Sequence, residues 1–428
     1  MSPEKHINES VDHLFRHHAG QMTAVLSRIF GFEKIDLIED AIQEAMLRAL
    51  SNWSYKGIPD NPRAWLIQVA KNNILDRLRR DSRSEDLEEE TKALDQYAEL
   101  AEGNTEIGFA NEILEDQLQM IFACCHPSLT PDSRIALTLK TVGGFSVGEI
   151  AAAFLSNKEA IAKMLVRAKK RLRDEGEVLS IPEPRDIPSR IEPVLKVLYL
   201  MFNEGYSASV GESAVRRDFC YEAIRLARLL SEHPLTSAPN VHALTALFCF
   251  QASRLPARSG EGGTVIVLPD QDRSLWDRDL IGEGLRRLKR SAKGEELSDY
   301  HIEAEIASHH AVAQDYGSTD WRALLAAYDR LLERRHSPIA ALNRIIAFAE
   351  VNGSEPALEE LERIRDEKLE AYYPYHVTLA ELQNRTGRYK EALQSYEFAA
   401  GLIENDAVKR FLTSKAEALS WEVRSRQF

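Results

Sequence analysis

The sequence predicts an all-α protein. Apolar residues recur at helical spacing through most of the 428-residue chain, and a 34-residue period near the C-terminus is typical of paired helices. One stretch has strand character: Thr264–Leu268 follows a glycine-rich segment at 260–263, and we expect it to form a local hairpin or an extended loop. Helices therefore have to supply the core of every domain.

The composition excludes several classes of protein. Apolar residues make up 44% of the chain and charged residues 28%, as in a folded globular protein rather than a disordered tail. No apolar run reaches the roughly 18 residues of a membrane-spanning helix. The polar opening MSPEKHINES also lacks the apolar core of a signal peptide. Four cysteines are too few for a disulfide scaffold. We therefore expect a cytoplasmic protein with reduced cysteines and no membrane partner.

The net charge of −13 is unevenly distributed, and its shifts mark the domains. Residues 84–117 carry twelve acidic side chains and one basic side chain, whereas Lys158–Arg173 carries seven basic side chains and one acidic. The stretch 180–190 holds three prolines, which disfavour helix at the residues before them. The sequence thus predicts helices over 1–83, an acidic linker over 84–117, a compact helical domain over 118–175 and a large helical domain over 188–428.

The first element is a helix over 33–50 with one apolar face and one acidic face. Its predicted core positions are Ile38, Ala41, Ile42, Ala45, Met46 and Ala49. The opposite face carries Asp36, Asp40, Gln43, Glu44 and an exposed leucine, Leu47. An acidic stripe with one apolar residue suits docking against a basic partner helix, although an ordinary solvated face fits the same pattern.

The next helix, over 61–80, has a polar and aromatic face. Asn61 can cap it and Pro62 suits its first turn. The outward residues are Trp65, Gln68, Asn72, Asp76, Arg79 and Arg80. Arginines can hold phosphates while Asn and Trp read or stack on unpaired bases. A surface helix with ion pairs and a half-buried Trp is the alternative.

Residues 146–172 have the pattern of a helix-turn-helix. Ser146 and Glu149 form a capping-box pattern, and the small Ala151 permits a close helix crossing. On the second helix the inward positions are apolar, and the outward positions are Glu159, Lys163, Arg167 and Lys170. Such a helix can enter the major groove of DNA. A plain helical hairpin with a solvated basic face is the alternative.

The 34-residue period relates Gly353 to Gly387, and Leu324 to Leu358 and Ala392. This spacing fits helix pairs that bury their apolar stripes by stacking. The segment LAELQNRTGRYKEALQSYEFAA resembles a tetratricopeptide repeat, with a turn at Gly387 and with Ala392 and Tyr396 packed inside.

Together these elements resemble the sigma-70 class of bacterial sigma factors, in particular the small extracytoplasmic-function group. EDAIQEAMLRAL and NPRAWLIQVAKNNILDRLRR are similar to region 2, and VGEIAAAFLSNKEAIAKMLVRAKKRLR is similar to region 4. Three further stretches, CCHPSLTPDSRIALTLKTVGGFS, LYLMFNEGYSAS and DQDRSLWDRDLI, are typical of a subgroup with a tetratricopeptide-like extension. The resemblance implies a region 2 helical bundle, a region 4 helix-turn-helix and a tetratricopeptide-like (TPR-like) helical repeat domain.

The resemblance also implies partners and site residues. Core RNA polymerase would meet the acidic stripe through its β′ clamp and also contact the chain through its β subunit. The −10 promoter element would meet Trp65, Asn72, Asp76, Arg79 and Arg80, and the −35 element would meet the face from Glu159 to Lys170. The repeats would tune activity by binding a regulatory protein or ligand. The acidic linker could imitate nucleic acid in the polymerase, cover the basic helices or serve as a flexible spacer.

Other motifs indicate no catalytic chemistry. Cys124, Cys125 and His126 are too close together for a zinc site, and we expect them to form a buried helix end. No hydrolase, metalloprotease, calcium or nucleotide-binding motif is present. We therefore expect no enzyme, no metal and no cofactor. The predicted function is that of a sigma factor. Its rival is a TPR-type adaptor for protein interactions that binds nucleic acid without sequence preference.

Overall fold

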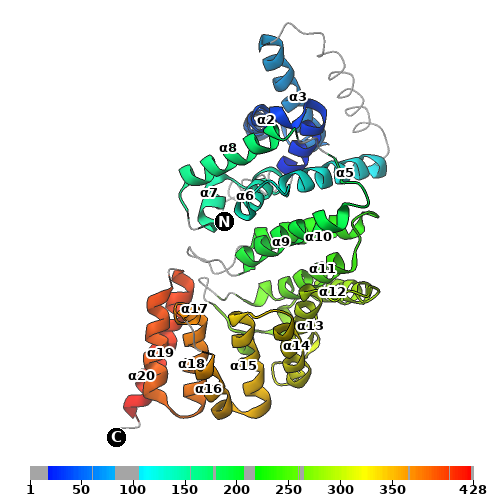
Figure 1. The fold of residues 1–428 in the computed structure, drawn as a ribbon. Helices are drawn as coiled ribbons and strands as arrows, with labels where there is room; N and C mark the ends of the chain where they lie inside the picture. The colour runs from blue at the N-terminus through cyan, green and yellow to red at the C-terminus, as the bar shows by residue number, and fades with distance from the viewer. Residues whose placement is uncertain are drawn as a thin grey trace. The chain divides into compact units, whose positions relative to one another are not determined.

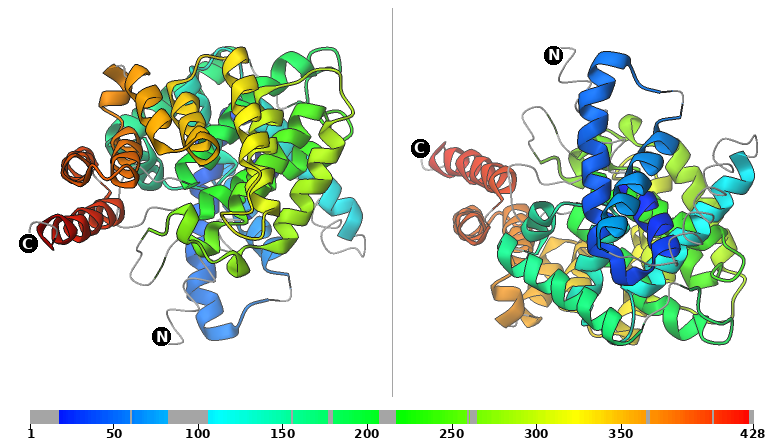
Figure 2. Two further views of the ribbon diagram at one scale, coloured as in Figure 1. Left: turned by 90° about the horizontal axis from the view of Figure 1, so that it is seen from below. Right: turned by 90° about the horizontal axis from the view of Figure 1, so that it is seen from above.

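The computed structural model describes residues 18–59, 61–81, 106–154, 156–176, 180–206, 217–258, 260, 265–364, 367–403 and 405–425 (Figure 1). Within these ranges every regular element is a helix, which confirms the predicted all-α fold. The chain divides into two compact units, residues 1–198 and residues 199–428. Two further views of the ribbon are given in Figure 2.

Unit 1 begins with a three-helix bundle. It comprises a helix over 18–30, a short 3₁₀ helix η1 (Phe32–Lys34), α2 (Ile35–Lys56) and α3 (Pro62–Asp81). Asn61 accepts a hydrogen bond from the Ala64 backbone N–H at 3.0 Å, as its predicted capping role requires. The bundle core contains Ile38, Ala41, Ile42, Ala45 and Ala49 from α2, which confirms the predicted apolar face. Met46 is half-buried at the edge of this core.

The second half of unit 1 contains α5 (Glu106–Cys124), α6 (Pro131–Thr141), α7 (Val147–Ala153) and α8 (Lys158–Asp174). The predicted capping box is present: the Ser146 N–H donates to the Glu149 carboxylate at 2.8 Å, and the Glu149 N–H donates to the Ser146 hydroxyl at 3.2 Å. α7 and α8 contact each other and α6, as in a helix-turn-helix. Leu155, in the turn, lies outside the described residues.

Two boundaries differ from the sequence prediction. Residues 106–117 were assigned to the acidic linker, but they belong to α5, whose C-terminal half is buried from Asp116 onward apart from half-buried Gln119. Residues 84–105 lie outside the described residues. We also expected a boundary at 180–190. Instead α9 (Ile187–Tyr206) begins inside that stretch, because Pro188 falls in the first turn, where no backbone N–H is needed. The division between the units falls at Leu198, within α9.

The first part of unit 2 packs around α11, a helix with almost no exposed face. Its α-helices are α10 (Arg217–Glu232), α11 (Pro239–Ala252), α12 (Arg278–Ser291) and α13 (Asp299–Val312). Three 3₁₀ helices lie between α11 and α12: η2 (Leu255–Ala257), η4 (Leu268–Asp270) and η5 (Arg273–Leu275).

The predicted strand is not formed in the described residues. Val265 makes an isolated bridge, and the Ile266 N–H donates to the Arg258 carbonyl at 2.9 Å. The chain then enters η4 at Leu268, where Pro269 favours the helical turn over a strand. The segment is therefore the extended loop that was the alternative to a hairpin; Thr264 lies outside the described residues.

The rest of unit 2 is a series of stacked helix pairs. They are α14 (Trp321–Arg334), α15 (Pro338–Asn352), α16 (Ser354–Arg363), α17 (Glu367–Glu370), α18 (Tyr373–Arg385), α19 (Tyr389–Leu402) and α20 (Asp406–Ser425). Apart from the short α17, which contacts α15 and α18, each contacts the next long helix along the chain. Figures 1 and 2 show α18, α19 and α20 side by side in orange to red.

The 34-residue period corresponds to equivalent places in these pairs. Gly353 and Gly387 each lie in the turn between two helices with positive φ angles of 93° and 78°, a conformation that favours glycine. Leu324, Leu358 and Ala392 are all buried, and Tyr396 is packed inside as predicted. The period therefore reflects one repeated helix-pair geometry in α14, α16 and α19.

Candidate DNA and polymerase interfaces

The outward face of α8 is where the sequence placed it. Glu159, Lys163, Arg167 and Lys170 are exposed, whereas Ile161, Leu165, Ala168 and Leu172 are buried. Asn157 caps the helix by accepting from the Ala160 N–H at 2.7 Å. Within the described part of the chain, Lys163 and Arg167 form no ion pair. The face therefore presents unneutralised cations at the spacing of one helical turn.

The polar face of α3 is also exposed, with one exception. Gln68, Asn72, Asp76, Arg79 and Arg80 are exposed, and Arg79 lies 3.6 Å from Asp76. Trp65 was predicted to project from this face. It is half-buried instead, because its ring packs at 5.5 Å against the ring of Trp53 from α2 at the edge of the bundle core. Only part of the indole can therefore stack on a base.

The acidic stripe of α2 is partly occupied by basic residues of its own unit. Leu47 is 64% exposed, as predicted, and Gln43 is exposed. Arg77 of α3 lies 3.5 Å from Asp40 and 3.4 Å from Glu44, and Arg48 lies 2.6 Å from Glu44. These pairs are solvent-exposed and worth little energy, so a basic partner can displace them at small cost.

A second set of ion pairs joins α2 to α8. The Lys169 ammonium lies 2.9 Å from both Asp36 and Glu39, and Arg173 lies 2.9 Å from Asp36. The Lys169 side chain is only 6% exposed and that of Glu39 16%. Burial disfavours the charged form of Lys169, but the carboxylates of Glu39 and Asp36 outweigh burial and raise its pKa. Burial likewise opposes the charge of Asp36, yet hydrogen bonds from Lys169 and Arg173 lower its pKa.

Two further contacts hold the same surfaces together. Gly20, in the first helix, approaches the end of α6 so closely that an added Cβ would lie 1.8 Å from the Val142 carbonyl oxygen. Arg28 of the first helix lies 2.7 Å from Asp116 of α5, whose side chain is 4% exposed. In this structure, therefore, the inner side of α8 and the end of α6 pack on the bundle that carries the acidic stripe.

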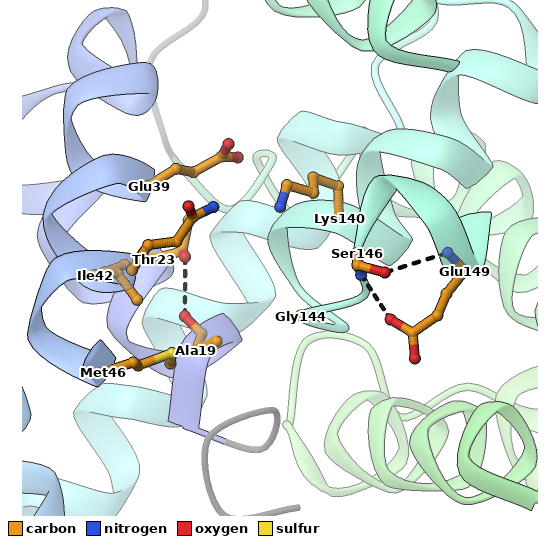
Figure 3. Close-up of a pocket in the computed structure, with 10 residues that line it drawn as sticks. Ala19, Thr23, Glu39, Ile42, Met46, Lys140, Gly144, Ser146 and Glu149 are labelled. Carbon is orange, nitrogen blue, oxygen red and sulfur yellow. Dashed lines mark hydrogen bonds between the residues drawn. The ribbon is translucent and has the colours of Figure 1, made fainter. Parts of the chain in front are cut away.

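A cavity of about 370 Å³ remains between these surfaces (Figure 3). Glu39, Gln43 and Met46 of α2 line one side, and Lys140, Gly144 and the capping box of α7 line the other. Gln43 of the acidic stripe is thus directed toward this cavity, and Asp36 toward α8. Only Asp40, Glu44 and Leu47 lie on the part of the stripe away from these contacts.

The sequence prediction missed the residues that make these contacts. Lys169 was counted in the basic run of α8, but its place four residues after Leu165 puts it on the inward side of that helix. Glu39 similarly lies four residues after the buried Ile35 and three before the buried Ile42. Helical phase alone could have placed both at an internal contact, although it could not have named their partners.

The cysteines form the predicted buried helix end. α5 ends at Cys124, and all four cysteines are buried and free. The Cys124 thiol lies 3.0 Å from the Thr141 hydroxyl. Burial raises the pKa of the Cys125 thiol to about 12 and also raises that of Cys124.

Among the described residues there is no metal-binding cluster of three or more His, Cys, Asp or Glu. Over the same residues, no helix combines the length and apolar character needed to cross a membrane.

Known families match three segments of the chain. Residues 14–84 match sigma-70 region 2, residues 119–172 match sigma-70 region 4, and residues 190–292 match a family of unknown function, DUF6596. An uncharacterized protein of Rhizobium meliloti (strain 1021) is 37% identical over 394 residues, which cover 91% of this chain and 92% of that protein. No solved structure matches the chain.

The bundle that carries the acidic stripe coincides with the region 2 match, and the capped helix-turn-helix coincides with the region 4 match. The two regions support a sigma factor for promoter-directed transcription. The chain contains sigma-70 regions 2 and 4, and these two matches indicate a sigma factor of the extracytoplasmic-function type. These regions support binding to core RNA polymerase and promoter DNA. The extension matches a family of unknown function, so its tetratricopeptide character stays a prediction.

Proposed function

We propose that this sigma factor recognises the −35 promoter element through the outward face of α8 and the −10 element through α3, in the cytoplasm. The observation that carries the proposal is the exposure of Lys163 and Arg167 without ion-pair partners among the described residues, on a helix whose opposite side is buried. Lys163 and Arg167 can reach base edges and phosphates in the major groove, and Glu159 and Lys170 flank them. Asn72, Asp76, Arg79 and Arg80 would hold the unpaired −10 strand.

For polymerase binding we assign the acidic stripe Asp36, Asp40, Gln43, Glu44 and Leu47. Exposed carboxylates around one exposed leucine fit a basic helix with an apolar contact at its centre, as on the β′ clamp. Asp36 has to leave Lys169 and Arg173 before it can meet that partner. We therefore infer that α8 separates from α2 when the holoenzyme forms. The extension, residues 199–428, would modulate activity.

Reconstituted transcription with core polymerase tests this assignment. Replacing Lys163 and Arg167 together by alanine should lower promoter-specific transcription more than about tenfold, because two groove contacts are lost. Binding to core polymerase should stay unchanged. The matched control is Lys409→Ala with Arg410→Ala, which removes two exposed cations from α20. Equal transcription by both variants would contradict the assignment of α8.

The adaptor function makes a different prediction for co-purification. If the chain is a sigma factor, the β and β′ subunits should co-purify with it and be lost in Asp40→Lys. The stacked helix pairs of unit 2 favour the adaptor as the second candidate. A peptide-binding partner that persists in Asp40→Lys, with no polymerase subunit recovered from the unmodified chain, would favour that candidate.

A further inference from the structure

Unit 2 contains a cavity of about 520 Å³ that the sigma function leaves without a role. It lies between the loop 267–270 and the helices α11, α13, α14, α15, α18 and α20, labelled in Figure 1. Its walls are largely apolar and aromatic, and Trp321, Tyr328 and Phe411 are among the aromatic side chains that line it. Size and lining are typical of a site for a small organic molecule.

The cavity wall holds an arginine that has no counter-ion among the residues that the structure describes. Arg254, between α11 and η2, donates from Nε to the Gln271 side chain at 3.3 Å. Its guanidinium lies 5.5 Å from the centre of the Trp276 ring. No carboxylate of the described residues forms an ion pair with it. Because a guanidinium has five N–H donors and keeps its charge, most of its hydrogen-bonding capacity is left for a ligand.

The charged neighbours of Arg254 are two further arginines, which contact backbone carbonyls and an aromatic ring. Arg273 is buried and donates to the backbone carbonyls of His310 and Ala313 at 2.6 and 2.9 Å. Arg258 stacks on the ring of Tyr206 at 3.8 Å. Three guanidinium groups therefore cluster on this side of unit 2. Among the described residues none of them forms an ion pair with a carboxylate, although Asp315 favours the charged form of Arg273 electrostatically. Unpaired charges of this kind are costly to bury, so they point to an anion that the site is built to receive.

Two buried polar side-chain atoms on the same wall also have no hydrogen-bond partner among the described residues. They are Oε1 of Gln251, in the last turn of α11, and Nδ1 of His310 on α13. Burial, together with Arg254 and Arg273, lowers the pKa of His310 to about 3, so its ring is neutral. A neutral imidazole and an amide can each complete the coordination of a polar ligand group.

The other charged residues of the cavity are accounted for. Glu350 is paired with Arg385 at 2.7 Å and accepts from the Tyr316 hydroxyl. Glu381 accepts from the Tyr396 hydroxyl at 2.6 Å and lies 3.7 Å from Lys415. Asp270 is exposed and forms no ion pair with Arg254. Positive charge therefore remains at the Arg254 end, and the α18 end is balanced.

We propose that this cavity binds a small organic anion, a carboxylate on an aromatic or aliphatic body. The carboxylate would sit on the Arg254 guanidinium, whose planar fork matches two carboxylate oxygens. The apolar body would extend along Trp321 and Tyr328. This site is independent of the promoter and polymerase surfaces of unit 1, and it gives the extension a ligand class.

Binding measurements on the full chain test the proposal, with 4-phenylbutyrate as the probe, 4-phenylbutanol as its uncharged analogue and inorganic phosphate as an anion without an apolar body. Saturation-transfer NMR and quenching of tryptophan fluorescence report binding. We expect 4-phenylbutyrate to bind at least tenfold more tightly than either of the other two. Equal binding of the alcohol would show a merely apolar cavity and overturn the proposal, as would equal binding of phosphate or no binding of 4-phenylbutyrate.

Variants at Arg254 separate a binding role from a structural role. Arg254→Met should abolish 4-phenylbutyrate binding, and Arg254→Lys should weaken it because the charge stays but the fork is lost. The matched control, Arg322→Met on α14, should bind as the unmodified chain does; Arg322 is exposed and does not line the cavity. Without ligand, Arg254→Met should keep its Tm within about 2 °C or raise it, because an unpaired charge is removed. Binding that persists in Arg254→Met, or a large fall in its Tm, would overturn the proposal.

Discussion

Single residues decide whether the two halves of unit 1 can pack, and Gly20 is the sharpest case. An added Cβ would lie 1.8 Å from the Val142 carbonyl oxygen, and a backbone atom cannot move aside as a side chain does. We expect Gly20→Ala to destabilise unit 1 by about 1–3 kcal/mol, measured by urea unfolding. The control is Gly401→Ala in α19, where nothing lies within 4 Å and alanine should be neutral or stabilising. Equal stability of the two variants would contradict this close packing.

Buried histidines make unit 2 sensitive to acid. Burial, aided by Arg287 and Arg290, lowers the pKa of His242 from 6.5 to about 4. Between these two values the unfolded chain holds a proton that the folded chain does not, so stability falls as the pH is lowered from 6.5 to 4. His242→Gln should reduce this loss, because glutamine can still bond to Ser237 but does not titrate. Thermal unfolding of both proteins between pH 4.5 and 7.5 measures the difference, and parallel curves would refute it.

Residue positions that depend on one helix were predictable, and those that depend on two were not. The outward face of α8 follows from its own amphipathic register and capped start, so Lys163 and Arg167 are exposed as expected. The half-burial of Trp65 depends on Trp53 in another helix. Lys169 and Asp36 are 133 residues apart, and no local pattern links them. Arg254 also escaped prediction, because an arginine without a counter-ion is visible only once the surrounding carboxylates are placed.

At the scale of elements, the contact between α2 and α8 controls how much of the acidic stripe is available. Its charges are stable across neutral pH. Because the pKa of Asp36 is lowered, its contribution to stability is fully present at any pH above 3.8, the ordinary pKa of an aspartate. Because the pKa of Lys169 is raised, its contribution to stability is fully present at any pH below 10.5, the ordinary pKa of a lysine. The contact therefore responds to a competing basic surface or to salt rather than to physiological pH.

Reversing one charge of this contact should open it. In Lys169→Glu a buried position faces Asp36 and Glu39 with like charge, so we expect α8 to separate from α2. Spin labels on α2 and α8 should report a longer distance, and core polymerase should bind several-fold more tightly because Asp36 is released. Lys170→Glu is the matched control. Lys170 follows Lys169 in the chain but is exposed, so this variant has the same change of charge outside the contact. An unchanged distance in Lys169→Glu would exclude this role.

The ends of helices were predicted well where residues close in the sequence determine them, as in caps and turns. The caps at Asn61 and Ser146 and the turn at Gly387 lie where they were predicted, and Gly353 occupies the equivalent turn one period earlier. The start of α5 was missed because charge was used to define the linker. Acidic residues do not by themselves exclude a helix: Glu115 of α5 is exposed, and Asp116 is buried in an ion pair with Arg28. The strand at 264–268 was overestimated because β-branched residues favour extended backbone without providing a partner strand.

For the whole molecule, the question is how a chain of net charge −13 binds DNA at all. The cations of α3 and α8 act at short range, whereas the excess negative charge repels DNA at long range and is screened by salt. Much of that excess lies in residues 84–117, which follow α3 in the sequence and precede α8. We therefore expect the linker, rather than the total charge, to limit binding of free sigma factor to DNA.

Neutralising five linker acids tests this expectation. Changing Glu85, Asp86, Glu88, Glu89 and Glu90 to their amides alters the net charge from −13 to −8, five units less negative. The control makes the same change at five exposed glutamates of unit 2, Glu359, Glu362, Glu391, Glu397 and Glu417. At low salt the linker variant should bind promoter DNA severalfold more tightly than the control, measured by fluorescence anisotropy, and the gap should close as salt is raised. If both variants gained equally, total charge would be the determinant and local masking of α3 and α8 by the linker would be excluded.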